Sequence, residues 1–402
     1  MAMFRALRHP SFRLLWGSVF LGQLGYWFAN IAFQWEVAHR TDNDPVALGV
    51  LYFVGFTPYL AFSLFAGVLA DGRDRRLLLV GIQAASVAVA LACFGLTLAD
   101  ATPPAVVLVL AFLAGCVITF LSPAHQSLIA NVVPARDLGS AVPLQAAGLN
   151  LARIAGPALA GPAILLAGST AAFAIFTATC VGSALLAWRI KVPARARVVA
   201  TESVGRRLVG GLRHARERPP TAMALLVVAI ASMFGSTFQA QLPLLGARVS
   251  ADGGTAFLTL VVLGGLGSLV GVLLVARRRA PLPLPATAVL LAVLGAIVSV
   301  LGYVRSFPLM AVLMAVAGGV LFGVMTSINT LIQHVVDDDQ RGRVLSLYFI
   351  CWGGLLPVAG LAAGALIALA GIGTAFAVLG GVTAAFGVGI AAKALTRRPT
   401  AA

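Results

Sequence analysis

Charge is scarce in this 402-residue chain, which holds only 13 aspartates and glutamates. Charged residues make up 10% of the sequence, against about 25% in soluble globular domains. Apolar residues reach 60%, so a soluble fold would lack the polar surface needed to cover itself. We therefore expect most of the chain to face lipid, and to do so as helices, because the bilayer core offers no partner to free backbone groups.

The motifs of several enzyme and cofactor classes are also missing. The four cysteines stand alone inside apolar runs, with no Cys-x-x-Cys or metal-ligand spacing. No Gly-x-x-x-x-Gly-Lys-Ser/Thr loop is present, which argues against direct ATP hydrolysis. The aspartates 337–339 resemble one acidic motif of membrane prenyltransferases, but those enzymes need two. Because Arg341 and Arg343 follow closely, we expect a solvated, salt-bridged loop and no cofactor.

The net charge of +15 comes almost wholly from arginine, since lysine occurs only at Lys191 and Lys393. This usage is typical of GC-rich coding and hints at a bacterial source. The arginines gather in short connections between apolar runs, so they indicate membrane topology rather than nucleic-acid binding. The odd-numbered connections hold only Arg40, Arg248 and Arg305. The positive-inside rule then places both termini in the cytoplasm, here of a bacterial inner membrane.

Apolar stretches long enough to cross a bilayer, at about 20 residues each, recur along the chain. The first is too long for the apolar region of a signal peptide, so we expect it to be retained. The sequence predicts twelve spans, at 12–38, 46–70, 77–99, 104–130, 140–167, 170–190, 221–247, 254–276, 284–304, 307–335, 344–370 and 374–394. A basic cytoplasmic linker, 191–219, separates an N-terminal six-helix bundle (1–190) from a C-terminal one (220–402).

The two halves repeat each other in sequence. Gly-Val-Leu at 67–69 recurs 204 positions later at 271–273, and arginines follow both copies. Ser-Leu-Ile at 127–129 recurs 203 positions later as Thr-Leu-Ile at 330–332. Two segments that share nearly one offset indicate a duplicated unit. Membrane proteins built from such repeats are typically alternating-access transporters, whose site lies between the repeats near the bilayer midplane.

One stretch resembles the signature loop of a transporter family. Residues 67–76 read Gly-Val-Leu-Ala-Asp-Gly-Arg-Asp-Arg-Arg, which is similar to the Gly-x-Leu-x-Asp-Arg-x-Gly-Arg-Arg loop between helices 2 and 3 of the major facilitator superfamily. Its Asp-x-x-Asp-Arg-Arg form resembles the branch of bacterial siderophore (enterobactin) exporters and macrolide efflux pumps. The segments 12–16, 153–157 and 341–344 fit that branch too. The resemblance covers the whole chain and implies twelve helices in two pseudo-symmetric bundles.

The same loop predicts a conformational lock at the cytoplasmic side. Gly67 allows two helices to approach closely, and the Asp71 carboxylate can cap a neighbouring helix N-terminus. Arg75 and Arg76 can bond carboxylates or the carbonyls of helix ends. The alternative is that the arginines only set topology. Val275 replaces the aspartate in the second half, so we expect the lock to be asymmetric.

A second motif lies in the fifth span. The run from Gly156-Pro157 to Gly161 resembles the Gly-Pro-x-x-Gly-Gly motif of the family's antiporters, with Ala160 in place of one glycine. In that family the motif marks exporters. Pro157 bends the helix and the small residues allow tight packing. Runs of alanine and glycine occur throughout this chain, so a chance match is the alternative.

Ionisable groups inside a span are functional candidates by default. Arg153 lies in the middle of the fifth span and Glu36 lies late in the first. At 1.5 Å per residue they differ in depth by about 15 Å, too far for contact. Arg153 is instead level with Tyr26 and Asn30. It either bonds backbone carbonyls near the kink at Pro157 or binds an anionic group of the substrate.

Glu36 is the one acid within a predicted span, so it is the candidate proton carrier. The alternative is an interfacial acid paired with Arg40, one helical turn away. His125 in the fourth span can titrate as well, although a lone histidine near a helix end is more often a satisfied polar residue.

The remaining pathway candidates are polar or aromatic residues of spans 1, 4, 7 and 10, which line the central cavity in the resembling family. They are Tyr26, Asn30, Gln34, Gln126, Gln239 and Asn329. Each amide can instead bond a neighbouring helix. The sequence thus predicts a monomeric, proton-coupled exporter of a small molecule that is not an enzyme. The alternatives are an importer on the same fold and a membrane-embedded lipid or prenyl enzyme.

Overall fold

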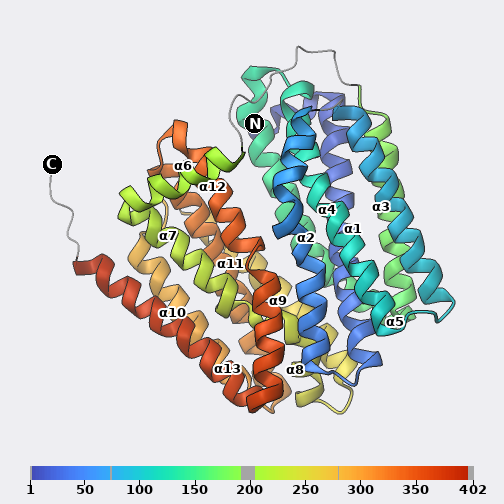
Figure 1. Cartoon of the computed structure of the whole chain (residues 1–402), viewed down its shortest axis with the longest axis vertical. Helices are drawn as coiled ribbons and strands as arrows, with labels where there is room; N and C mark the ends of the chain where they lie inside the picture. The colour runs from blue at the N-terminus through green and yellow to red at the C-terminus, as the bar shows by residue number, and fades with distance from the viewer. Residues whose placement is uncertain (1, 73–74, 192–203, 279, 397–402) are drawn as a thin grey trace. The chain divides into compact units, whose positions relative to one another are not determined.

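A computed structural model of the chain describes residues 2–72, 75–191, 204–278 and 280–396 (Figure 1). These residues form helices and no strand. The first part contains η1 (Ala2–Arg8), α1 (Pro10–Arg40), α2 (Pro45–Gly72), α3 (Arg75–Leu98), α4 (Pro104–Val132), η2 (Ala135–Asp137) and α5 (Leu138–Trp188). The second contains α6 (Val204–Glu217), α7 (Pro219–Ile230), η3 (Ala231–Gly235), η4 (Thr237–Gln241), α8 (Leu242–Val249), α9 (Gly253–Ala276), α10 (Leu284–Leu301), α11 (Phe307–Val335), α12 (Asp338–Gly353) and α13 (Leu356–Thr396).

Local sequence explains where several helices begin. Proline is the first residue of α1, α2, α4 and α7, where its missing N–H would have no partner in any case. Aspartate caps the starts of α2 and α9. Asp44 accepts a hydrogen bond from the Ala47 N–H at 2.7 Å, and Asp252 accepts one from the Thr255 N–H at 3.1 Å. Both carboxylates also meet the positive end of the helix dipole.

Nine stretches of the described chain are long and apolar enough to cross a membrane. Two of them are too long for one crossing. The 51 residues of α5 would extend for about 77 Å as one straight helix, more than twice the hydrocarbon thickness of a bilayer. The backbone leaves helical geometry at Ala167 and Gly168 in α5, and at Gly371 in α13. The fold class is as predicted, whereas the exact count of twelve spans stays a prediction.

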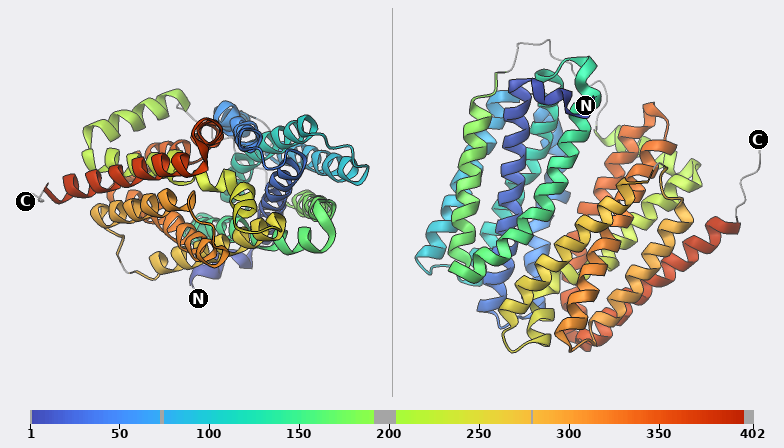
Figure 2. Two further views of the ribbon diagram at one scale, coloured as in Figure 1. Left: turned by 90° about the horizontal axis from the view of Figure 1, so that it is seen from below. Right: turned by 180° about the vertical axis from the view of Figure 1, so that it is seen from behind.

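The two internal breaks are separated by the same offset as the repeated sequence segments. Gly168 and Gly371 have φ angles of 72° and 78°, a region that glycine adopts without steric cost. They lie 203 positions apart, the offset found between the repeated segments. The chain doubles back at both places (Figures 1 and 2). The same turn device therefore occurs at the same place in each half, as expected of a duplicated unit.

The chain divides into two compact units. The N-terminal unit comprises Met1–Glu36 and Thr57–Val204, and the C-terminal unit comprises Val37–Phe56 and Gly205–Ala402. The sequence had assigned the segment 37–56 to the first bundle, whereas its contacts place it in the C-terminal unit. The boundaries predicted at 190 and 220 stay a prediction.

Buried hydrogen bonds join three spans of the N-terminal unit. The Gln83 amide of α3 donates to Ser18 Oγ of α1 at 3.1 Å and to Ser183 Oγ of α5 at 2.6 Å. Ser18 and Ser183 also donate to each other's backbone carbonyl, at 2.9 and 2.7 Å. All three side chains are buried. Farther along the same helices, Ser86 and Cys180 lie 3.2 Å apart. A polar seam thus fixes the register of α1, α3 and α5.

Glycine contacts join the spans of the C-terminal unit instead. A Cβ atom built on Gly271 of α9 would lie closer than 3.0 Å to Gly319 of α11, and one on Gly295 of α10 equally close to Gly380 of α13. Such distances place backbone directly against backbone. The segment 37–56 packs in the same way, since a Cβ on Gly49 would lie 2.7 Å from the Gly360 carbonyl oxygen.

The span predicted as one helix over 221–247 is irregular. After α7 the backbone forms a π-helical turn, η3, and then the 3-10 turn η4 before α8 begins. Ser236 donates a hydrogen bond to the Ser232 carbonyl at 2.7 Å, and Thr237 donates to the Phe234 carbonyl at 2.9 Å. Hydroxyl groups that bond back to the backbone compete with helical hydrogen bonds. Because the segment is largely apolar, its sequence does not indicate this break.

The predicted linker is described from residue 204 onward, and residues 192–203 lie outside the described ranges. Its second part forms the amphipathic helix α6, whose Gly211 packs against the Arg343 backbone of α12. Arg218 and Asp337 form an ion pair at 2.9 Å. The loop predicted at 337–339 is instead the start of α12, with Asp337 just before its first residue. The Arg213 guanidinium bonds Glu217 at 2.8 Å, and this carboxylate raises the pKa of Arg213.

Candidate functional site

The predicted lock falls at the junction of α2 and α3. Gly67 and Asp71 lie in the last turns of α2, and Arg75 and Arg76 begin α3. Their side chains lie outside the described part of the structure, as do residues 73–74. The lock therefore stays a prediction.

The helix 5 motif has a clear packing role. A Cβ atom on Gly156 would lie 2.5 Å from the Trp27 Cβ and 3.1 Å from the Leu24 carbonyl oxygen, so only glycine lets α5 lie this close to α1. Gly161 is buried one turn farther on, and Pro157 lies within the helix. The Trp16 indole N–H donates to the Leu144 carbonyl at 2.9 Å lower on the same two helices. The motif thus holds α1 and α5 together along their length.

Arg153 lies one turn before Gly156 on α5. Its guanidinium carbon is 5.4 Å from the centroid of the Trp27 ring, within the cation–π range of about 6 Å. The phenols of Tyr26 and Tyr59 are close enough to interact electrostatically with it. This agrees with the predicted position of Arg153 near Tyr26, whereas its level relative to Asn30 stays a prediction. The sequence did not point to Tyr59, which comes from α2.

Trp27 also contacts Tyr26 and carries a buried indole N–H. Its ring meets Tyr26 edge-on, with the centroids 5.6 Å apart and an interplanar angle of 76°. Its indole N–H is buried and finds no acceptor among the residues that the structure describes. A buried donor without a partner is costly. The arrangement therefore presents a guanidinium, an indole N–H and phenols around one point of α1.

Asn30 and Gln34 continue this side of α1, three and seven residues beyond Trp27. The Gln34 amide donates to Asn30 Oδ1 at 3.1 Å. Gln34 is buried, and its Oε1 has no donor within the described chain, whereas Asn30 is half-buried. Residues at this spacing share one face of a helix. Asn30 and Gln34 therefore follow Trp27 along one face of α1, and their place beside Arg153 stays a prediction.

Glu36 occupies a different place, at the far end of α1. It is 6% exposed and accepts hydrogen bonds from Thr102 Oγ1 at 3.2 Å and from Ser169 Oγ. Thr102 belongs to the connection before α4, and Ser169 follows the break at Gly168. Glu36 therefore ties together two connections and the end of α1. Neither partner was predicted, since their approach depends on the fold.

His125 belongs neither to the residues around Arg153 nor to the hydrogen bonds of Glu36. It is 3% exposed in α4, and its Nε2 has no hydrogen-bond partner in the described residues. Its neighbour Gln126 is exposed. The buried core beside it includes Leu121, Ala124 and Leu128.

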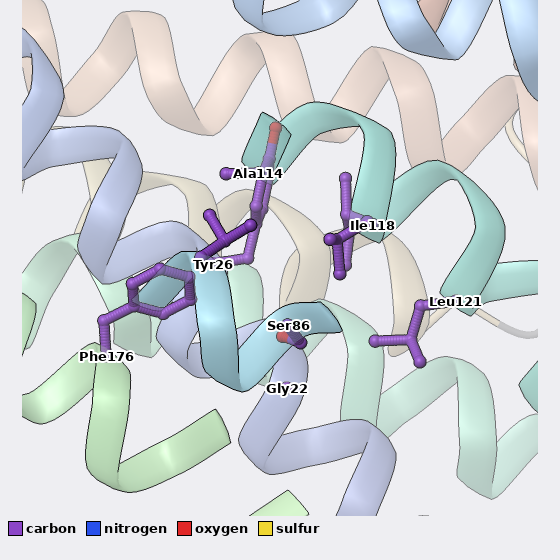
Figure 3. A pocket seen from close by; sticks show the side chains of 9 residues that line it. Gly22, Tyr26, Ser86, Ala114, Ile118, Leu121 and Phe176 are labelled. Atoms are coloured by element: carbon purple, nitrogen blue, oxygen red, sulfur yellow. The ribbon is translucent and has the colours of Figure 1, made fainter. Parts of the chain in front are cut away.

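Tyr26 also lines a small hollow inside the N-terminal unit. Figure 3 shows Ser86, Ile118, Leu121 and Phe176 pointing toward it from α3, α4 and α5. Its volume is about 10 Å³, which holds roughly one water molecule. The hollow is therefore far too small for a transported molecule.

The two remaining candidates lie in the C-terminal unit. Gln239 is half-buried in η4, where the span after α7 is irregular. Asn329 of α11 accepts a hydrogen bond from Gln333 at 2.5 Å. Their part in a cavity shared with α1 and α4 stays a prediction.

With this geometry in place, comparison with known proteins identifies the family. Residues 1–401 match the family described as transmembrane secretion effector. The chain belongs to this family of the major facilitator superfamily. It is also 30% identical over 150 residues to the staphyloferrin A transporter of Staphylococcus aureus (strain NCTC 8325 / PS 47). That match covers 37% of this chain and 38% of the relative.

Solved structures of major facilitator transporters share the fold. A bacterial homologue of the human lysosomal transporter Spinster matches with a TM-score of 0.71 and 14% identity, over 98% of both chains. The nucleoside transporter NupG matches with a TM-score of 0.68 and 12% identity, over 97% of this chain and 100% of that one. This major facilitator protein is therefore a multi-pass transporter of small molecules and not a membrane-embedded enzyme.

Proposed function

We propose that this transporter exports a small molecule across the bacterial inner membrane, by alternating access and at the expense of the proton gradient. The observation that carries the proposal is the helix 5 motif. Gly156 is held against Trp27 beside Arg153, so the antiporter-like motif forms the wall of the candidate site. The family description, which refers to secretion, supports the same direction, and the staphyloferrin A transporter among the relatives supports a small-molecule substrate.

Glu36 offers a physical route for proton coupling. An ionised carboxylate accepts hydrogen bonds at both oxygens, here from Thr102 and Ser169. A protonated carboxyl group must donate from one oxygen, so proton uptake would rearrange these bonds. Because the bonds tie two connections to α1, this change can alter helix packing at that end of the N-terminal unit.

Cellular accumulation tests the direction and the coupling together. The chain is expressed in a bacterial strain that lacks its main drug and siderophore exporters, and labelled macrolides and siderophores are measured inside the cells. We expect at least one compound to accumulate less than in the empty-vector strain, and a protonophore to remove the difference. Accumulation that rises with expression would show import instead.

A matched pair of variants tests the proton carrier. Glu36→Gln keeps the size of the side chain and removes its titration, so we expect the pH dependence of transport to flatten. Asp42→Asn makes the same change in the connection that follows α1. We expect that control to transport with the wild-type pH profile. An unchanged profile in Glu36→Gln would remove Glu36 from the coupling role.

A further inference from the structure

We infer that helix α6 is a docking surface for anionic lipid headgroups, so that the basic linker binds the surface of the bilayer. This interaction is separate from the proposed export and involves none of the residues of the candidate site. It follows from a helix that is attached to the C-terminal unit on one side and exposes arginine and leucine on the other.

Two contacts hold α6 at the starts of two spans. Glu217 ends α6, and α7 begins two residues later at Pro219, which opens a stretch long and apolar enough to cross a membrane. A Cβ atom on Gly211, in the middle of α6, would lie 2.9 Å from the Arg343 carbonyl oxygen of α12. Arg343 lies three residues after the start of another such stretch, Gln340–Ala394. Because both contacts are at span ends, α6 lies at the boundary between bilayer and water, beside α12 (Figure 1).

Burial divides α6 into two sides. The side that packs against α12 is buried at His214 and Ala215. The opposite side exposes Leu212, Arg213 and Arg216, and 64% of Leu212 is accessible. Leucine beside cations is typical of helices that lie in a membrane interface, where the apolar group enters the acyl boundary and the cations meet the headgroups.

The charge of the linker suits an anionic surface. Helix α6 contains four arginines and one glutamate. The whole linker, 191–219, has eight lysines and arginines against two glutamates, a net charge of +6. Each such cation near an anionic bilayer strengthens binding about fivefold. The composition of the linker therefore favours lipids that carry negative charge over zwitterionic ones.

One arginine of the exposed side already has a partner within α6. The Arg213 guanidinium meets the Glu217 carboxylate at 2.8 Å, and both side chains are exposed. An exposed pair of this kind contributes little, because water competes with it. A guanidinium has five N–H donors, so Arg213 can keep this pair and still bind a phosphate.

The competing explanation is a solvated linker whose arginines only set the topology. A single exposed leucine is ordinary on a helix that faces water. A solvated helix would be indifferent to the charge of the lipid. A docked helix must respond to it.

Hydrogen–deuterium exchange of the full-length protein in nanodiscs separates the two explanations. The discs contain either phosphatidylcholine alone or a three-to-one mixture of phosphatidylcholine and phosphatidylglycerol. Backbone amides exchange when a helix opens locally, and contact with a surface opposes that opening. We expect the amides of α6 to exchange at least about fivefold more slowly in the anionic discs, while those of α9 stay unchanged. Equal exchange of α6 in both kinds of disc would overturn the inference.

Variants then locate the contact. Arg213→Gln combined with Arg216→Gln removes two charges from the exposed side and keeps good helix formers in their place. We expect most of the slowing by phosphatidylglycerol to be lost. Arg305→Gln is the matched control, since it removes an exposed arginine from the connection between α10 and α11. Slowing that survives in the double variant would place the lipid contact elsewhere and overturn the assignment to α6.

A soluble phosphate distinguishes the bilayer from a free ligand. Glycerol 1-phosphate is added to discs of phosphatidylcholine alone, so that the same chemical group is present without an anionic surface. We expect no slowing of exchange in α6. Slowing by glycerol phosphate alone would identify a soluble ligand and overturn docking on lipid. None of these measurements involves transport, so their outcome is independent of the proposed export.

Discussion

The two halves of this transporter repeat short segments of sequence, yet two of their helix contacts are built by different means. In the N-terminal unit, Gln83 joins Ser18 and Ser183 through buried hydrogen bonds. In the C-terminal unit, the missing side chain of Gly387 lets α13 lie directly against α10. The turn glycines Gly168 and Gly371 are kept in both units.

This difference separates what the fold requires from what it tolerates. The reversal of the chain needs a residue with positive φ, and both halves supply glycine there. The contact between neighbouring spans needs only close complementarity. Polar side chains provide it where α3 meets α1 and α5, and backbone approach provides it between α10 and α13. Substitutions should therefore act through lost hydrogen bonds at the first contact and through steric clash at the second.

Exchanging the two packing modes should have the largest effect in the C-terminal unit. Gly387→Ser introduces a serine of the kind that joins the spans of the N-terminal unit. A Cβ there would lie closer than 3.0 Å to the Ala292 backbone N, so α10 and α13 must separate. We expect a loss of about 3 kcal/mol or failure to fold, the upper range for overpacking. The apparent melting temperature of the detergent-solubilised protein measures it, and a variant as stable as wild type would refute the steric account.

Neighbouring glycines of α13 provide a sharper comparison. A Cβ on Gly380 would lie closer than 3.0 Å to the Ser299 backbone N, whereas a Cβ on Gly381 would meet nothing within 4 Å. Gly380→Ala should lower stability by about 1–3 kcal/mol. Gly381→Ala should be neutral or raise it by up to about 1 kcal/mol, because alanine favours the helix. Similar melting temperatures for the two variants would contradict the packing described for this helix pair.

The reciprocal exchange in the N-terminal unit should be milder. Ser183→Gly removes the hydroxyl that accepts a hydrogen bond from the Gln83 amide, and the substitution creates no clash. Hydrogen bonds between membrane helices are worth about 0.6–1.7 kcal/mol, and the glycine adds about 1 kcal/mol of helix cost. We expect a fall in melting temperature smaller than that of Gly387→Ser. A larger fall would mean that the polar seam dominates the packing of both units.

The helix cap at Asp252 should give the smallest effect. The hydrogen bond from the Thr255 hydroxyl lowers the pKa of this exposed carboxyl below its ordinary value of 3.8. A lowered pKa in the folded state means that the stabilisation is present above pH 3.8 and is lost as the pH falls through the folded value. Asp252→Asn does not titrate, so its stability difference from wild type should shrink between pH 6 and pH 3. Melting curves over that range measure it, and a constant difference would rule out a contribution from the charge.

The sequence predicted membrane-spanning helices because a helix must be long and apolar to cross a bilayer. It also predicted the repeat, because short segments recur at nearly one offset. It also placed Arg153 near Tyr26, since a helix rises by a fixed distance per residue. It could not supply the partners of Glu36, because Thr102 and Ser169 come from connections far away in the chain. The break after α7 was hidden within an apolar run. The packing glycines could not be singled out among 43 glycines, because the sequence does not say which of them face a neighbour.

Transport into everted membrane vesicles tests the central claim most directly. Everted vesicles from cells that express the chain are energised by respiration, and uptake of a labelled siderophore or macrolide that responds in the accumulation assay is followed with time. Our account predicts uptake that depends on the expressed chain and stops when a protonophore is added. Uptake confined to right-side-out vesicles, or uptake indifferent to the proton gradient, would contradict it.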